Sequence, residues 1–414
     1  MPFRQSIQAG PAGGYSRCPP RNPRVCYGMS SLVWIEIDSG APDANLRELA
    51  GCAGGPITVC AVVKSNAYGH GLREIAGLLP SADWFAVNSL DEGLELRELG
   101  HDRPVLVLGH VPLSGLGDAV DAGLKLTVYN RETLEVLSSE ASARGVTADV
   151  HVKVETGTWR QGVLPEEVPA FFAEASSRPG IRLEGLSTHF ANIEDTLSHD
   201  YAEGQLRVFN GVLDRLGSEG ISVPVVHTAC TAATILFPET HFSMLRTGIG
   251  LYGLWPSRET FLSARMSGRR MPRLRPVLTW KTRIAQVKSV PEGAFIGYGC
   301  TYRTTRPSRI AVLPVGYADG YDRAIGNSGH VLVRGRRAPV TGRVCMNLTM
   351  VDITDVEGAR LEDEVVLLGR DGEEEITAEA MAGWAGTIGY EIVTRISPFL
   401  PRVVVDRGIG STGG

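Results

Sequence analysis

Hydrophobic and polar positions alternate in two distinct ways along the first two thirds of this 414-residue chain. Short apolar runs, which predict buried strands, are separated by segments in which apolar residues recur every three or four positions, which predict amphipathic helices. The helical pattern is clearest at residues 90–99, 131–143 and 201–216. The predicted strands are residues 33–38, 57–64, 84–88, 104–109, 126–129, 148–155, 183–189, 223–227 and 244–249.

A strand followed by a helix, repeated about eight times, favours parallel strands that close into a (β/α)8 barrel. A doubly wound open sheet is the alternative, although no G-x-G-x-x-G motif follows an early strand. We therefore expect an α/β fold in which residues 29–271 form a barrel domain.

The pattern changes after about residue 272. Short β-type runs are punctuated there by Gly, Pro, Asp and Asn, and helical periodicity is nearly absent outside residues 378–385. This predicts a mostly antiparallel β domain over residues 272–414, joined to the barrel by the basic, Pro-containing segment 263–276. The β-type runs are residues 279–287, 309–313, 330–333, 349–353 and 364–368.

Composition narrows the class of protein. Hydrophobic residues make up 43% of the chain, and the formal net charge of -5 gives no case for binding nucleic acid or an anionic membrane surface. No apolar run is long enough to span a bilayer. Seven scattered cysteines fit a reducing cytoplasm, and neither they nor the nine histidines have a metal-ligand spacing, so we expect a cytoplasmic protein without a metal site.

The first 28 residues differ from the rest of the chain. They contain four arginines, no acidic residue and much Gly and Pro. They lack the apolar stretch of a secretory signal, and their Gly and Pro oppose the amphipathic helix of a transit peptide. We interpret residues 1–28 as a disordered extension.

Lys64 ends an apolar run, residues 57–63, that has the pattern of a buried strand. Either the strand stops at Val63 and the lysine reaches solvent, or its amine sits in a pocket with a lowered pKa, ready to form a Schiff base. A barrel builds its pockets at the C-terminal ends of its strands, which makes the second interpretation stronger. Residues that end or follow predicted strands in this way are Lys64, Arg160, His189, Thr231 and Arg246.

The segment AVVKSNAYGHG around Lys64 closely resembles the pyridoxal-phosphate lysine motif of alanine racemases, fold-type III enzymes with an N-terminal barrel and a C-terminal β domain. Further similar segments follow in the family's order, and the resemblance extends from about Met29 to Val405. The lysine motif and GYADG are specific signals, whereas GRVCMN alone is weak. The further segments are VETGTWRQGV, LEGLSTHFAN, MLRTGIGLYG, YGCTYRTTRPSRIAVLPVGYADGYDR, GRVCMN and TIGYEI.

The resemblance implies a homodimeric, pyridoxal-phosphate-dependent amino-acid racemase that interconverts L-alanine and D-alanine, as in D-alanine biosynthesis. Lys64 would bind the cofactor and act as one base, and Tyr298 from the partner subunit would act as the second. Arg246 would contact the pyridine nitrogen, and because a guanidinium stays protonated it would not give that nitrogen a proton. His189 would hydrogen-bond Arg246 and help to poise Tyr298.

The remaining implied roles concern the two ends of the bound molecules. The phosphate would be held by hydroxyls and backbone amides rather than by a basic cluster. The substrate carboxylate would be bound by Arg160, with Tyr317 and the amide of Met346 beside it. Lys153 matches a lysine that is carbamylated in some members, although an ordinary strand lysine is the alternative. The implied phosphate ligands are Tyr68, Thr231, Gly248, Ile249 and Tyr390.

Three positions depart from the family pattern. Asn347 stands where Asp is usual, Cys230 where Asn is common, and Trp159 where a small or polar residue is more usual. These departures leave the substrate open, with serine or another amino acid as alternatives to alanine. Basic amino-acid decarboxylases of the same fold type would need a carboxylate in place of Arg246. A non-catalytic pyridoxal-phosphate carrier would not need Tyr298, His189 or Arg160.

Overall fold

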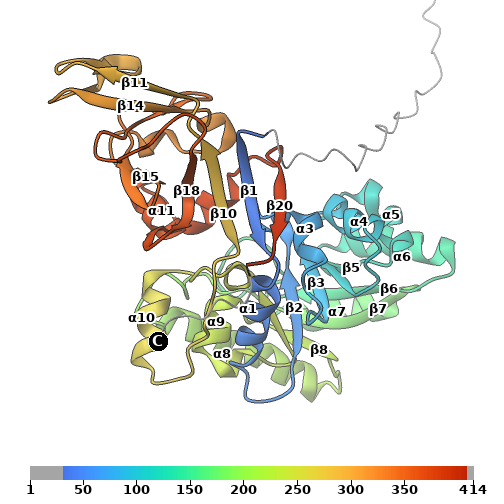
Figure 1. Cartoon of the computed structure of the whole chain (residues 1–414). Helices are drawn as coiled ribbons and strands as arrows, with labels where there is room; N and C mark the ends of the chain where they lie inside the picture. Colours follow the sequence, from blue (N-terminus) through green and yellow to red (C-terminus); the bar gives the residue numbers. More distant parts are fainter. Residues whose placement is uncertain (1–30, 408–414) are drawn as a thin grey trace, which may run out of the picture.

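The computed structural model describes residues 31–407, and its first regular part is a nearly closed barrel (Figure 1). Eight parallel strands follow the order β8-β7-β6-β5-β4-β3-β2-β9. The two end strands meet through bonds such as that from the Arg246 amide to the Ala229 carbonyl (3.0 Å). The strands are β2 (Thr58–Val62), β3 (Trp84–Val87), β4 (Val105–Val107), β5 (Lys125–Val128), β6 (Ala148–Lys153), β7 (Ile181–Ser187), β8 (Val225–His227) and β9 (Met244–Thr247).

Helices surround these strands, as the alternating pattern predicts. Strands such as β3 and β4 are apolar without alternation because one side faces the barrel interior and the other faces the helices. Strand β4, for example, is buried at all three of its positions. The helices are α1 (Ala41–Ala50), α3 (Leu72–Ala76), α4 (Leu90–Glu98), α5 (Leu116–Asp121), α6 (Arg131–Arg144), α7 (Val168–Ser177), α8 (Asp200–Ser218), α9 (Thr231–Leu236) and α10 (Arg258–Met266).

The second part is a predominantly antiparallel sheet in the order β16-β15-β18-β10-β1-β20, with β19 paired to β18. Smaller sheets join β11, β14 and β17, and β12 with β13. The predicted combination of a (β/α)8 barrel and a mostly antiparallel β domain is therefore confirmed. The strands are β1 (Val33–Asp38), β10 (Leu278–Arg283), β11 (Gln286–Val290), β12 (Phe295–Ile296), β13 (Tyr302–Arg303), β14 (Ser308–Leu313), β15 (His330–Val333), β16 (Arg336–Pro339), β17 (Thr349–Asp352), β18 (Glu364–Asp371), β19 (Glu374–Ile376) and β20 (Arg402–Val405).

Strand β1 corrects one detail of the prediction, which placed residues 33–38 in the barrel. It pairs instead with β10 and, in parallel, with β20, and these three strands lie side by side in Figure 1. Its burial alternates along the strand, which suits a sheet with only one buried face. The alternating sequence VWIEID already contrasts with the continuous apolar run of β2.

Helix α11 (Ala378–Ala385) coincides with the predicted segment, whereas the sequence pattern missed α12 (Gly389–Thr394), which carries Tyr390 into the region of the barrel mouth. The basic segment predicted as a linker begins inside α10 rather than after it. The predicted N-terminal extension, residues 1–28, lies outside the described residues. Within residues 31–407 no helix is long and apolar enough to cross a membrane.

Candidate active site

A cavity of about 1040 Å³ opens at the C-terminal ends of the barrel strands. It gathers most of the residues that the sequence singled out, because parallel strands in a barrel all end on the same side. Three others, Tyr298, Tyr317 and Met346, do not line it. The lining residues among those predicted are Lys64, Tyr68, Lys153, Arg160, His189, Thr231, Arg246, Gly248, Ile249 and Tyr390.

Lys64 follows β2 and is half-buried in the cavity wall. Burial, together with the positive charge of Arg160, lowers the pKa of its amine. A lysine in this state has a larger neutral, nucleophilic fraction than a solvated one. The second of the two interpretations of this lysine therefore agrees with its surroundings.

The chain turns sharply after Lys64 through four residues in the left-handed conformation, with φ between 51° and 56° at residues 65–68. Each such residue that is not glycine costs about 1–2 kcal/mol. The Glu92 carboxylate accepts hydrogen bonds from the amides of Ser65 (2.5 Å) and Asn66 (3.3 Å), which offsets part of this cost. The turn directs Tyr68 back toward the cavity.

Arg246 is buried on β9 at the base of the cavity. Its guanidinium donates to the Nδ1 atom and the carbonyl of His227, and to the carbonyls of Thr188 (2.8 Å) and Thr228 (3.1 Å). Burial lowers its pKa to about 10, so the group remains a cation at neutral pH. These four contacts fix the plane of the guanidinium.

The imidazole that accepts a hydrogen bond from Arg246 is His227, not His189 as the resemblance implies. The His189 carbonyl accepts from Thr158 (2.7 Å), and burial, with the charge of Arg246 second, holds the pKa of its imidazole well below the usual range. His227 ends β8 just as His189 follows β7, so the chain offered two histidines at equivalent places. Position along a strand cannot distinguish between them.

The hydroxyl of Thr231 accepts hydrogen bonds from the amides of Gly248 (3.1 Å) and Gly250 (3.4 Å). A Cβ atom at Gly248 would lie 2.6 Å from the Tyr68 hydroxyl, so glycine is required for this approach. Hydroxyls and backbone amides thus form one side of the cavity, without a basic side chain among them. Such a group of donors suits a phosphate.

Glu194 lies in this same part of the cavity and was not predicted. Its carboxyl accepts from the Tyr390 hydroxyl (2.9 Å) and lies 3.9 Å from the Cys230 thiol. Burial, with Asp195 as a smaller cause, raises its pKa. The adjacent acidic residues at 194 and 195 were visible in the sequence but did not directly follow a predicted strand, so nothing assigned them to the site.

Arg160 lies at the exposed rim of the cavity in a loop organised by Glu155, whose carboxylate accepts from the amides of Gly157 (2.6 Å) and Arg160 (3.0 Å). Deeper in the wall, the Lys153 amine donates to Gln161 (3.2 Å). Burial, followed by the charges of Arg160 and Arg246, lowers the Lys153 pKa to about 8. The carbamylation of Lys153 that the resemblance implies stays a prediction.

Tyr298, Tyr317 and Met346 lie in the C-terminal part of the molecule and are exposed by 74%, 43% and 57%. The Tyr317 amide donates to the Cys345 carbonyl (3.0 Å), which places Tyr317 beside Met346. The three residues are therefore available at the surface but separate from the cavity of their own chain.

Two family models match the chain, described as the N-terminal domain of alanine racemase over residues 37–256 and its C-terminal domain over residues 277–404. A curated alanine racemase from Halothermothrix orenii is 43% identical over 372 residues, covering 89% of this chain and 96% of that protein. One from Leptospira interrogans is 38% identical over 377 residues, covering 90% and 96%.

Solved structures agree with these sequence matches. The alanine racemase of Clostridium difficile 630 superposes with a TM-score of 0.84 at 36% identity, covering 92% of this chain and 97% of that one. The alanine racemase of Bacillus anthracis with bound L-Ala-P also gives 0.84, at 34% identity and with 91% and 96% covered.

Proposed function

Because the chain belongs to the alanine racemase family, we propose that it is a pyridoxal-phosphate-dependent racemase that interconverts L-alanine and D-alanine. The observation that carries this proposal is the presence of Lys64, with its lowered pKa, in one cavity with buried Arg246 and rim-exposed Arg160. The amine, the buried cation and the second cation face the same space. They correspond to the three groups that an amino-acid racemase of this kind needs.

The residues present fit the cofactor. Lys64 offers an amine for its aldehyde, and Arg246 offers a fixed N–H donor for its ring nitrogen. The hydroxyls of Tyr68, Thr231 and Tyr390 and the amides of Gly248 and Ile249 would hold the phosphate. When bound there, pyridoxal phosphate supplies the electron sink that makes the α-proton of an amino acid acidic.

Arg246 would also restrain the reaction. Its guanidinium remains protonated and donates hydrogen bonds without releasing a proton, so the ring nitrogen it contacts would stay unprotonated. This would weaken the electron sink and disfavour side reactions that need a longer-lived carbanion. Racemisation only removes and returns one proton, so it can proceed with the weaker electron sink.

Racemisation needs a proton acceptor on one face of the α-carbon and a donor on the other. We propose that Lys64 serves one face and that Tyr298 of a second copy serves the other. Tyr298, Tyr317 and Met346 are exposed and lie outside their own chain's cavity, which supports a two-fold dimer in which each chain completes its partner's site. Arg160 would hold the substrate carboxylate between the two bases.

A coupled D-alanine assay tests this function together with an absorbance scan. We expect the purified protein to bind pyridoxal phosphate with visible absorbance and to convert L-alanine, and Lys64→Ala to lose both properties. Lys153→Ala is the matched control, because it removes a neighbouring buried amine and should keep the absorbance. Turnover of serine but not alanine would assign the alternative substrate, and cofactor binding without turnover of any amino acid would indicate a carrier.

A further inference from the structure

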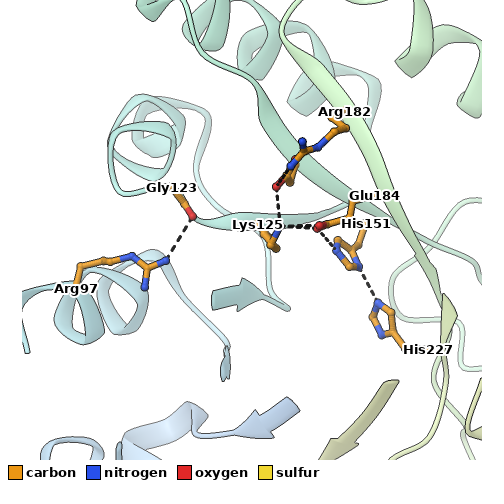
Figure 2. Close-up of polar contacts among 8 residues, drawn as sticks. Arg97, Gly123, Lys125, His151, Arg182, Glu184 and His227 are labelled. Carbon is orange, nitrogen blue, oxygen red and sulfur yellow. Dashed lines mark hydrogen bonds and ion pairs between the residues drawn. The ribbon is translucent and has the colours of Figure 1, made fainter. Parts of the chain in front are cut away.

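A continuous line of polar side chains leads from Arg246 through the barrel interior to the opposite end of the strands. Figure 2 shows the part from His227 to Arg182. His227 contacts His151 (2.8 Å between Nε2 and Nδ1), and His151 Nε2 contacts Glu184 Oε2 (3.0 Å). The Lys125 ammonium lies 2.7 Å from Glu184. Because Lys125 begins β5, the line ends at the side of the barrel away from the cavity.

The hydrogen atoms along this line can be assigned in one direction only. The Arg246 guanidinium can only donate, so Nδ1 of His227 accepts and its Nε2–H donates to His151. His151 then accepts at Nδ1 and donates from Nε2 to the Glu184 carboxylate, which can only accept. Arg246 at one end and Glu184 at the other require the same direction of donation. Both imidazoles are therefore neutral, with the hydrogen on Nε2.

The charges agree with this assignment. Burial lowers the pKa of both His151 and His227, and it does so although Glu184 raises that of His151. Burial alone would raise the Glu184 pKa, but hydrogen bonds from His151 and Lys125 lower it. Glu184 is therefore ionised at neutral pH, with two neutral rings between it and the Arg246 cation.

The chain makes room for this line at a specific glycine. A Cβ atom at Gly185 would lie 2.1 Å from Nδ1 of His151, the atom that faces His227. Gly185 pairs with His151 in the register of β6 and β7 and is not in the left-handed region. Its lack of a side chain is therefore needed for space rather than for backbone conformation.

Among residues 31–407, no carboxylate lies within ion-pair distance of Arg246, although its charge is buried. A buried cation without a counter-charge is costly. We propose that Glu184 is the remote counter-charge of Arg246 and a positioning residue for it, acting through His151 and His227. The effect of Glu184 on racemisation rests on the proposed function, whereas the coupling of Glu184 to Arg246 through the two histidines does not.

Asp149 provides a matched control. Both carboxylates pair with Lys125 and are similarly buried, with side-chain exposures of 14% for Asp149 and 17% for Glu184. Asp149 pairs otherwise with Arg182, and only Glu184 contacts an imidazole. Glu184→Gln and Asp149→Asn therefore remove equivalent charges from Lys125, but only the first removes the negative charge at the end of the line to Arg246, since the Gln oxygen can still accept from His151.

Nuclear magnetic resonance of the apoprotein with 15N-labelled histidine measures the coupling without any need for activity. Glu184→Gln should shift the ring resonances of both His151 and His227, since polarisation passes along a hydrogen-bonded chain. Asp149→Asn should leave those of His227 in place. A shift confined to His151, or an equal shift of His227 in both variants, would overturn the proposal.

Gly185→Ala keeps every charged group and tests the same line if Glu184→Gln does not fold. The added methyl should separate the two rings, so that the His227 Nε2–H exchanges with water faster than in the unmodified protein. Unchanged protection of that proton would contradict the coupling.

Steady-state kinetics test the positioning role. Glu184→Gln should lower kcat for alanine by about tenfold or more, the effect typical of groups that orient a functional side chain, with KM changed less than twofold because Arg160 is untouched. Asp149→Asn should keep the unmodified kcat. An unchanged kcat in Glu184→Gln would refute only the positioning role of Glu184. If the unmodified protein were inactive, the proposed function would be refuted, and the histidine resonances would still decide whether Glu184 is coupled to His227.

Discussion

The Tyr390 hydroxyl donates a hydrogen bond of 2.9 Å to the carboxyl of Glu194 inside the cavity. Thr231 lines the same cavity, and we propose that these hydroxyls hold a phosphate. An ionised Glu194 would repel that phosphate, whereas a protonated one would not. Burial raises the Glu194 pKa although the hydrogen bond from Tyr390 lowers it, and the charge of Asp195 adds a smaller increase, so the protonated, compatible form is favoured.

Glu194→Gln should bind pyridoxal phosphate more tightly than the unmodified apoprotein at pH values where Glu194 is ionised, by about tenfold if one partly screened charge repulsion is removed. The unmodified protein should lose affinity relative to this variant as pH rises through the Glu194 pKa above 4.5, since only it gains a negative charge there. Fluorescence titration at several pH values measures the difference. Phosphate titrates near pH 6 in both proteins and cancels in the comparison.

Asp195→Asn is the control, because Asp195 also lines the cavity but is exposed, so solvent screens its charge and its removal should change affinity less than that of Glu194. The raised pKa also affects folding. A carboxyl that holds its proton more tightly when folded contributes stability below its unfolded pKa near 4.5, and this contribution is lost as pH rises through the folded value. Weaker cofactor binding by Glu194→Gln at all pH values would show that the carboxyl supports the phosphate site through Tyr390.

The fold was predictable from the sequence because repeated strand–helix alternation has few solutions. Strand β1 was assigned to the wrong sheet since its position in the chain, before the first helix, is that of a barrel strand. Its alternation of buried and partly exposed positions was the better guide, because a barrel strand such as β4 is buried at every position and β1 is not.

The site was predictable only as far as strand ends define it. Lys64 and Arg246 lie together because the barrel brings all strand ends to one mouth. The choice between His189 and His227 depends on which ring reaches Arg246, and that is a matter of side-chain direction. The left-handed turn at residues 65–68 has one glycine at its end and none within it, so the residue types do not predict it.

Trp159 is held at φ 53° while 78% of its surface is exposed, so its backbone strain is not offset by burial within this chain. Glycine adopts this conformation without strain, whereas alanine does not. Trp159→Gly should therefore have a free energy of unfolding about 1 kcal/mol higher than Trp159→Ala, measured by urea denaturation. Both variants lack the indole, so the difference between their free energies of unfolding reports the backbone strain alone.

If the loop between Glu155 and Arg160 relaxes when the indole is removed, the two variants will be equally stable, and strain at this position is then not a property of the loop. A second comparison concerns the indole itself. Should the dissociation constant of the dimer rise equally in both variants, Trp159 is covered by the partner subunit, which would account for a bulky residue in this conformation.

The proposed dimer predicts complementation between two inactive proteins. Lys64 lines the cavity of its own chain, whereas Tyr298 is 74% exposed and lies outside it. A heterodimer of Lys64→Ala with Tyr298→Phe would have one site with both bases and one with neither. Random mixing makes half of the dimers mixed, so activity should recover to about a quarter of the unmodified value.

Subunit exchange must be shown separately, for example with one protein carrying an affinity tag. The double variant Lys64→Ala/Tyr298→Phe, mixed with the unmodified protein, gives no new complete site and serves as the control. Exchange without recovery would mean that each chain completes its own site, and that Tyr298 reaches the cavity by a movement of the C-terminal part.

The assignment of Tyr298 as the second base can be tested without relying on the dimer. Tyr298→Phe removes a hydroxyl that is exposed in the single chain and leaves Lys64, Arg246 and the proposed phosphate ligands in place. The variant should therefore bind cofactor normally and racemise about 10²–10⁴-fold more slowly, the usual cost of losing a positioned general base. The equilibrium constant between enantiomers is near unity by symmetry, so both directions must slow equally.

In D₂O, however, Lys64 can still exchange the α-proton of the enantiomer that presents it to the lysine. Proton exchange measured by nuclear magnetic resonance should then be much faster for one enantiomer of alanine than for the other. Equal exchange of both enantiomers at close to the unmodified rate would exclude Tyr298 as the second base, because a single base on one face cannot remove the α-proton of both enantiomers.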